Sequence, residues 1–194
     1  YTRQMVDGLI YLHSKGIIHR DIKPANILVD ERGTVKLADF GASKQINTGA
    51  GGQTLELENQ TLKGTPYFMA PEVMTQSGHG RKADIWSLAG TVMQMRTAVP
   101  PWKAEKFAGI IQLMCHIGGD PTAIPTLPSK EEVGVQLHDF LCQCFQRDPV
   151  QRPTATALSA HVFLALNANC FEAEDDDPMM NTLAMIESKW EKAG

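Results

Sequence analysis

Apolar residues recur at helical spacing near the start of the chain. Met5, Leu9 and Leu12 fall on one face of a helix, and Lys15-Gly16 marks the place where that helix should end. The same periodicity predicts three later helices: one carries Ile85, Leu88, Val92 and Met95, the next carries Leu137, Phe140, Leu141, Cys144 and Phe145, and the last runs from 154 to 165 with Thr154 as its N-cap. The chain is therefore predicted to be mainly helical.

Three short runs between residues 16 and 39 have the composition of strands instead. "GIIHR", "NILVD" and "TVKLAD" are rich in β-branched and apolar residues, and Pro24 and the turn "DERG" separate them. Residues 42 to 69 follow as a polar, glycine-rich stretch, which predicts a long loop. A loop of that length inside a compact domain is usually functional or disordered.

The composition changes after residue 165. The run "EAEDDDP" is acidic, and beyond it Met179, Leu183, Ile186 and Trp190 fall on one helical face. We therefore expect one domain over residues 1–165, followed over 166–194 by an acidic linker and a C-terminal amphipathic helix. That helix either packs back on the domain or docks a partner protein.

Composition excludes several functional classes. The net charge is −4 and there is no run of Lys and Arg, so no nucleic-acid binding is expected. No stretch approaches the roughly 20 apolar residues that a membrane span needs. The four cysteines, Cys115, Cys142, Cys144 and Cys170, form no C-x-x-C pair, so we expect reduced thiols. Reduced thiols fit a cytoplasmic location, and a nuclear location is also open.

The stretch "HRDIKPANILVD" begins a set of three ordered motifs. Residues 19–26 match H-R-D-x-x-x-x-N, residues 39–41 are D-F-G, and residues 70–72 are A-P-E. Over residues 1 to about 165 the chain resembles a eukaryotic protein kinase. The resemblance implies the large, mainly α-helical lobe of the kinase fold, with a few short strands that carry the functional loops. The small β-rich lobe, with its glycine-rich loop over ATP, would precede residue 1.

The resemblance gives the motif residues chemical roles in transfer of the γ-phosphoryl group of ATP. Asp21 would accept the proton of the attacking hydroxyl, and Lys23 would place a positive charge beside the transferring group. Asn26 and Asp39 would hold Mg²⁺, which prefers oxygen ligands. Leu28 would contact the adenine ring. Taken singly, these residues could be turn, cap or surface residues, but the complete pattern favours the functional interpretation.

The resemblance assigns other residues to the framework of the site. His19 and Phe40 would pack into the core that links the two lobes. Asp84 would cap the backbone around His19. Glu72 and Arg152 would form a buried ion pair that fixes geometry more than it stabilises.

Substrate class and regulation can also be predicted. Lysine two residues after the catalytic aspartate is typical of Ser/Thr kinases, and the Thr65 hydroxyl would bond Asp21 and Lys23. A phosphate on Thr61 could pair with Arg20 and Lys44 and order the activation loop. The alternative is that Thr61 is a polar loop residue without a regulatory role.

The details resemble one branch of the family. "FGASKQI", "GTPYFMAPEVM", "KADIWSLAGTVMQM" and "CFQRDPVQRPTA" look like the mitogen-activated protein kinase kinase kinase group. The resemblance implies a Ser/Thr protein kinase that uses ATP and Mg²⁺ and acts on a protein substrate, such as a downstream kinase, under an upstream kinase or scaffold. The competing hypothesis is a catalytically inactive large-lobe fragment that serves as an interaction or docking module.

Overall fold

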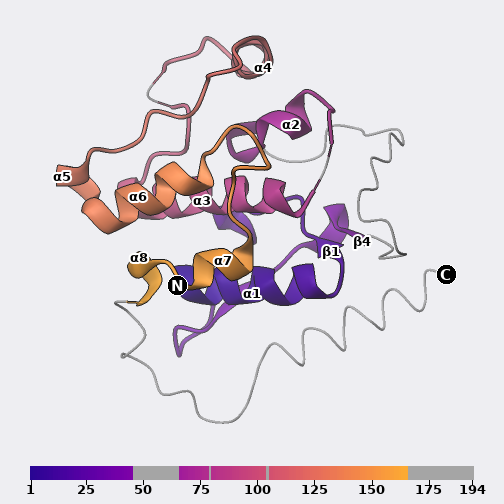
Figure 1. Ribbon diagram of the computed structural model, residues 1–194, viewed down its shortest axis with the longest axis vertical. Coiled ribbons are helices and arrows are strands. Elements are labelled where there is room, and N and C mark those ends of the chain that lie inside the picture. Colours follow the sequence, from indigo (N-terminus) through magenta and orange to yellow (C-terminus); the bar gives the residue numbers. More distant parts are fainter. Residues whose placement is uncertain (46–65, 79, 104, 166–194) are drawn as a thin grey trace.

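The fold is mainly helical, as a computed structural model shows for residues 1–45, 66–78, 80–103 and 105–165 (Figure 1). The α-helices are α1 (Thr2–Ser14), α2 (Pro71–Met74), α3 (Arg81–Thr97), α4 (Ile110–Gly119), α5 (Lys130–Val133), α6 (Val135–Cys144), α7 (Ala155–Ser159) and α8 (Val162–Ala165). Single 3₁₀ turns are η1 (Pro24–Asn26), η2 (Phe40–Ala42) and η3 (Pro66–Phe68). The predicted linker and tail helix lie outside the described residues.

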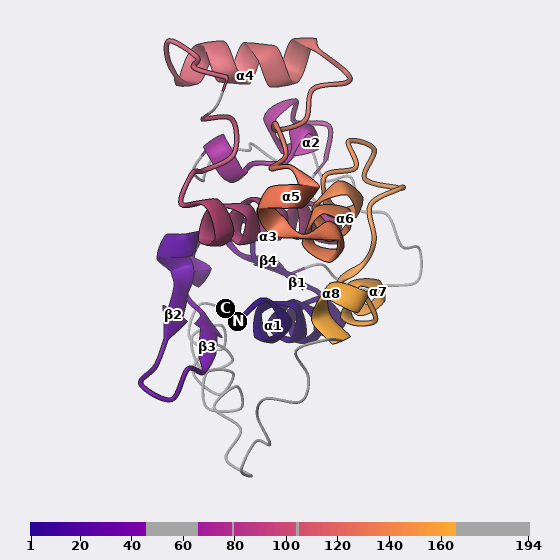
Figure 2. The same ribbon diagram turned by 90° about the vertical axis from the view of Figure 1, so that its left-hand side faces the viewer.

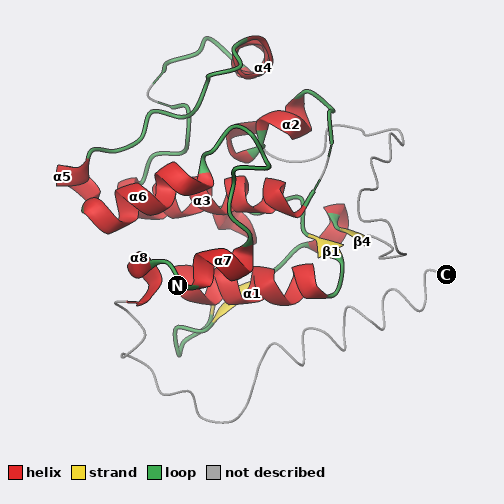
Figure 3. Cartoon of the chain, in the orientation of Figure 1, coloured by secondary structure: helices red, strands yellow, loops and turns green. Residues whose placement is uncertain are grey.

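Two short antiparallel strand pairs lie beside these helices (Figure 3). Strand β1 (Ile17–Ile18) pairs with β4 (Lys44–Gln45), and β2 (Ile27–Val29) pairs with β3 (Val35–Leu37). The predicted turn between β2 and β3 is closed by Asp30, whose Oδ1 accepts from the backbone nitrogens of Arg32 at 3.0 Å and Thr34 at 2.8 Å. Gly33 takes the positive φ of 80° that this turn requires.

Helix α3 is the centre of the core. Its segment Ala83–Met93 is buried at every position, so the helix has neighbours on all sides rather than a single apolar stripe. Helix α6 packs against it, and α1 packs against both α3 and α7 (Figure 2). Each large apolar side chain buried in this way contributes about 1.5–3 kcal/mol, which makes α3 a rigid support for the loops attached to it.

The first helix, the α3 helix and the α6 helix are where the apolar periodicity predicted them. The predicted helix over 154–165 is instead two helices. Thr154 does cap the first, because its side-chain oxygen accepts a hydrogen bond from the Ala157 nitrogen at 3.0 Å. The break occurs because His161 starts a new helix: its Nδ1 accepts from the Phe163 nitrogen at 3.2 Å.

Several elements escaped prediction. Helices α4 and α5, which lie on either side of Pro121 and Pro128, were not among the predicted helices. Strand β4 and turn η3 occupy the two ends of the predicted 42–69 loop. None of the described helices is long and apolar enough to cross a membrane.

Candidate active site

The β2–β3 hairpin brings two of the three motifs together. Asn26 stands immediately before β2, and Asp39 follows β3 by two residues. Ile27 pairs with Leu37, and the Ala38 nitrogen donates to the Asn26 carbonyl at 2.9 Å. Because antiparallel pairing places the start of β2 beside the end of β3, the predicted metal ligands lie at the same end of the hairpin.

The Asp21 carboxylate is held by two side chains from its own loop. Lys23 Nζ lies 2.6 Å from Asp21 Oδ2, and Asn26 Nδ2 lies 2.9 Å from the same oxygen. Asn26 Nδ2 also donates to the Asp21 carbonyl at 2.8 Å. Within the described residues both donors use Oδ2, so Oδ1 remains an acceptor for an incoming proton.

The donor set at this end of the hairpin fits Mg²⁺. Asn26 uses its amide nitrogen in both of these bonds, so its amide oxygen is available as a ligand. Among the described residues, the exposed Asp39 accepts on Oδ1 one long bond of 3.3 Å, from the Gly41 nitrogen. One amide and one carboxylate suit a cation that keeps water and phosphate oxygens as its other ligands. In the described part of the chain, no group of three His, Cys, Asp or Glu residues could hold a metal.

Both functional loops contain a left-handed residue that is not glycine. Arg20 has φ 70° and Asp39 has φ 61°. Each such conformation costs on the order of 1–3 kcal/mol and persists only where surrounding contacts impose it. At Arg20 the contact is Asp84, which is 1% exposed and accepts the His19 nitrogen at 3.0 Å and the Arg20 nitrogen at 2.9 Å. Asp84 therefore caps the backbone at His19 and Arg20.

His19 joins the two loops. Its Nε2 lies 3.1 Å from the Ala38 carbonyl, and its Nδ1 accepts from the Asp21 nitrogen at 3.3 Å. Its ring lies 4.9 Å from that of Phe40. These bonds require the neutral tautomer with the proton on Nε2, and burial lowers the pKa of His19 in the same sense. His19 and Phe40 thus pack against each other beside Asp21.

One polar member of the site was missed by the sequence analysis. His13 Nε2 lies 2.8 Å from Asp84 Oδ2, and both side chains are buried. The available signal was position: His13 follows Leu9 by four residues, so it lies on the buried face of α1, where a polar side chain needs a partner.

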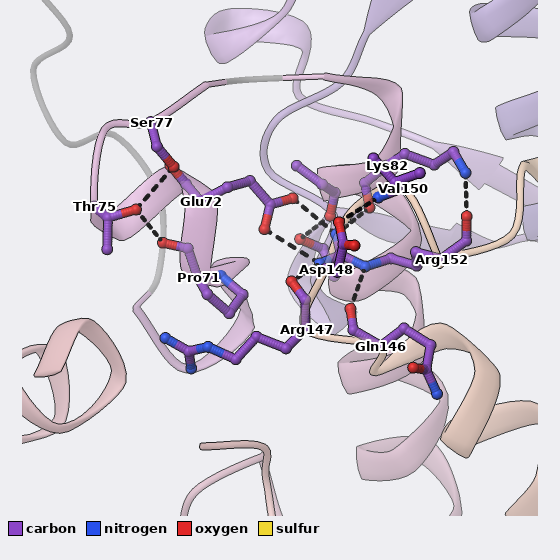
Figure 4. Close-up of polar contacts among 12 residues, drawn as sticks. Pro71, Glu72, Thr75, Ser77, Lys82, Gln146, Arg147, Asp148, Val150 and Arg152 are labelled. Atoms are coloured by element: carbon purple, nitrogen blue, oxygen red, sulfur yellow. Dashed lines mark hydrogen bonds and ion pairs between the residues drawn. The ribbon is translucent and has the colours of Figure 1, made fainter. Parts of the chain in front are cut away.

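The Glu72–Arg152 ion pair is present and is bidentate (Figure 4). Arg152 Nη1 lies 2.8 Å from Glu72 Oε1, and Nη2 lies 3.1 Å from Oε2. Arg152 also donates to the carbonyls of Gln146 at 3.0 Å and Lys82 at 2.6 Å, while Lys82 Nζ donates back to the Arg152 carbonyl. The guanidinium lies 5.1 Å from the Trp86 ring. The pair fastens the A-P-E segment to the start of α3.

The remaining predicted residues are dispersed. Leu28 is on β2 and 55% exposed, so its side chain is open to a ligand. Lys44 is on β4, opposite Ile18 of β1. The Arg20 Nε is buried without a partner among the described residues, and burial lowers the pKa of its guanidinium against the opposing effect of Asp84. Thr61 and Thr65 lie outside the described residues.

The profile described as "Protein kinase domain" matches residues 1–164. The chain belongs to the protein kinase family. Its relatives include mitogen-activated protein kinase kinase kinase A of Dictyostelium discoideum, 45% identical over 84% of this chain and 16% of the relative. Mitogen-activated protein kinase kinase kinase 3 of Homo sapiens is 47% identical over 86% of this chain and 25% of the relative. The resemblance to this group of Ser/Thr kinases is therefore confirmed.

The chain spans 16–25% of the length of these relatives. Mitogen-activated protein kinase kinase kinase 3 of Arabidopsis thaliana falls within the same range, with 45% identity over 84% of this chain and 24% of the relative. The mainly helical architecture with a few short strands agrees with the kinase fold that the motifs predicted.

Proposed function

We propose that the protein containing this chain is a Ser/Thr protein kinase, which transfers the γ-phosphoryl group of ATP to a hydroxyl of a protein substrate. The observation that carries the proposal is the grouping of Lys23 and Asn26 on the Asp21 carboxylate. A turn or surface role would not need a base, a cation and an amide joined within bonding distance. Family membership supports the same activity.

We infer a task for each side chain from this geometry. Lys23 and Asn26 fix Oδ2, so Asp21 presents Oδ1 to the substrate hydroxyl and takes its proton as the oxygen–phosphorus bond forms. Lys23 also places positive charge where negative charge develops on the transferring group. Asn26 and Asp39 would hold Mg²⁺, with Leu28 against the adenine of ATP. Bound there, Mg²⁺-ATP supplies the phosphoryl group and neutralises its charge.

The substrate proposal is narrower than the family. Lysine at position 23 is typical of Ser/Thr kinases. The matched relatives are named as mitogen-activated protein kinase kinase kinases. We therefore propose that a downstream protein kinase in a mitogen-activated cascade is the acceptor, that an upstream kinase or scaffold controls the enzyme, and that it works in the cytoplasm.

Regulation by loop phosphorylation belongs to the same proposal. Arg20 carries a buried Nε without a described partner, and its own backbone has a φ of 70° just before Asp21. Lys44 follows the D-F-G motif on β4. A phosphate on Thr61 that reached these cations would order the loop and give the buried Arg20 Nε an acceptor.

The test is phosphate transfer to a generic Ser/Thr protein substrate by the full natural product that contains residues 1–194. Asp21→Asn should abolish transfer while Mg²⁺-ATP binding persists, and Asp39→Ala should lose both. If the wild-type protein binds no nucleotide and transfers no phosphate, the proposal fails and the interaction-module hypothesis takes its place. Thr61→Ala should lower activity, and Thr54→Ala, which changes another threonine of the predicted 42–69 loop, should not.

A further inference from the structure

The side chain of Arg147 joins the segment after α6 to the end of α4. Its Nη1 donates to the Ala123 carbonyl at 2.8 Å, and its Nη2 donates to the Ile117 carbonyl. Both acceptor residues are buried, Ile117 completely. Because a buried carbonyl without a partner is costly, these two bonds give Arg147 a structural task that a surface arginine would not have.

Helix α4 needs an external donor at its C-terminal end. The Asp120 nitrogen donates to the His116 carbonyl at 3.0 Å, which closes the last regular turn. The next carbonyl, that of Ile117, would accept from the nitrogen four residues on, but Pro121 has no N–H. Arg147 supplies the missing donor, and its positive charge suits the C-terminal end of a helix.

The main chain of Arg147 is attached to the A-P-E segment. Its carbonyl accepts from Arg152 Nη2 at 3.4 Å, and the same nitrogen lies 3.1 Å from Glu72 Oε2. Figure 4 shows Arg147 beside the Glu72–Arg152 pair, with its side chain extending away from that pair. Glu72 belongs to α2, which packs against α4. Arg147 thus holds α4 with its side chain, and its main chain is linked to α2 through Arg152.

The charges around Arg147 come from both of these helices. Burial lowers the pKa of Arg147, and the charges of Asp120, just beyond α4, and Glu72, on α2, oppose that effect. An arginine keeps its charge at any pH at which the protein is folded. The two bonds from Arg147 to α4 and its following turn are therefore charge-assisted, which makes them stronger than bonds between neutral groups.

The position of α4 affects the chain on the acceptor side of the site. Helix α2 lies between α4 and α3 (Figures 1 and 2), and turn η3 leads into it. The Phe68 carbonyl of that turn accepts from Ser87 Oγ of α3 at 2.8 Å. ATP is assigned to the β2–β3 hairpin, so under the proposed function the segment around Phe68 borders the protein substrate instead.

We propose that Arg147 is a positioning residue for the protein substrate. By capping the end of α4 and joining it to the Glu72–Arg152 pair, it holds α4 against α2 and keeps the segment that precedes α2 in place. The role in substrate binding rests on the proposed kinase function, whereas the attachment of α4 does not.

The experiment compares three variants of the full natural product. Arg147→Leu removes both donors and keeps an apolar side chain. Arg147→Lys keeps the charge but replaces the planar fork with a single ammonium group. Arg96→Leu is the matched control, because it also removes an arginine whose Nη2 donates to a backbone carbonyl, that of Glu132 at 2.6 Å. For each we measure kcat and KM with dephosphorylated casein as the acceptor, KM for ATP, and amide hydrogen exchange over α4.

The two readouts should change together in Arg147→Leu. Exchange over α4 should accelerate by about 10- to 100-fold, since bonds from a charged donor are lost. KM for casein should rise by about 3- to 30-fold, the range over which one substitution alters coupling between packed elements. KM for ATP and kcat should stay within about twofold. Arg147→Lys should give intermediate values, and Arg96→Leu should leave exchange over α4 and KM for casein within about twofold of wild type.

Unchanged exchange over α4 in Arg147→Leu would overturn the inference. Faster exchange with an unchanged KM for casein would overturn the role in substrate binding, as would an equal rise of either KM in Arg96→Leu. Should Arg147→Leu fail to fold, Arg147→Lys decides the matter, and wild-type values of both readouts would refute the proposal. A wild-type protein that transfers no phosphate would refute the kinase proposal alone, because exchange still tests whether Arg147 holds α4.

Discussion

Lys23 Nζ and Asp21 Oδ2 are 2.6 Å apart on one loop, two residues from each other in sequence. The pair is partly exposed, with 22% of the Lys23 side chain and 12% of the Asp21 side chain open to solvent. Both side chains are therefore mostly buried, yet each can still be reached from solvent. Its arrangement serves a ligand that approaches from solvent.

Replacing Lys23 tests this arrangement. Lys23→Met should lower kcat by about 10²- to 10³-fold, the usual effect of removing one charge-stabilising group from a transition state. Thermal stability should change little. Lys103→Met, which removes an exposed lysine outside the site, is the control and should retain full turnover. An unaltered kcat in Lys23→Met would contradict the assigned role.

Asn26 has two proposed tasks that substitutions can separate. Asn26→Ala removes the proposed metal ligand and both bonds to Asp21, so the Mg²⁺ concentration for half-maximal rate should rise at least about tenfold, with lower kcat. Asn26→Asp keeps an oxygen ligand but sets a carboxylate against Asp21. Asn26→Asp should therefore restore the wild-type Mg²⁺ concentration for half-maximal rate but not the wild-type kcat. Titrating the rate with Mg²⁺ decides this, and identical curves for both variants would argue against a metal-binding role.

Breaking the Glu72–Arg152 pair should be costly. Glu72→Gln leaves the guanidinium of Arg152, whose side chain is fully buried, without its counter-charge. We expect a loss of about 3–5 kcal/mol in the free energy of unfolding, measured with urea. Glu31→Gln, at an exposed site, should stay within about 0.5 kcal/mol of wild type. A loss below about 1 kcal/mol in Glu72→Gln would show that the pair is not required for stability.

His19 should make the protein acid-sensitive. Burial lowers its folded pKa below the ordinary 6.5, so just below that pH the unfolded state binds the proton and the folded state does not. Stability is therefore present above pH 6.5 and declines as the pH falls through that value, by up to about 1.4 kcal/mol per pH unit. His19→Tyr, which does not titrate there, should show a shallower decline in urea unfolding at pH 7.5, 6.0 and 5.0. Parallel curves would refute this assignment.

Gly90 leaves no room for a side chain. A Cβ there would lie 3.0 Å from Phe68 Cδ1 and 3.0 Å from Pro101 Cγ. Overpacking of about 1–3 kcal/mol outweighs the roughly 1 kcal/mol that alanine gains in a helix, so Gly90→Ala should destabilise by about 1 kcal/mol. Gly118→Ala, on α4 with nothing within 4 Å, should be neutral or stabilising. The two unfolding free energies test the packing directly.

The sequence predicted what depends on local periodicity and motif spacing. The helix around Leu9, the helix around Leu88 and the grouping of Asp21 with Asn26 follow from 3.6-residue spacing and one short loop. Helix α4 was missed because it carries apolar residues on both its buried and exposed faces, such as Leu113 and Ile111, and prolines stand nearby. Periodicity analysis is uninformative for such a segment.

Long-range contacts could not be read from local pattern. The bond between His13 and Asp84 joins residues 71 positions apart, and neither residue belongs to the H-R-D or D-F-G motif. The break between α7 and α8 depends on His161 Nδ1 accepting a backbone hydrogen, which composition does not reveal. Sequence motifs indicate which groups react, whereas the contacts that hold those groups in place depend on the tertiary structure.

The position of Asp84 in α3 has a consequence for recognising inactive relatives. Asp84 is 65 residues from His19 in sequence and outside all three motifs, yet it accepts hydrogen bonds from the backbone nitrogens just before Asp21. A paralogue could keep H-R-D, D-F-G and A-P-E complete and still be catalytically inactive if it lost this carboxylate. A genome survey that scores pseudokinases by motif integrity alone would count such genes as active enzymes.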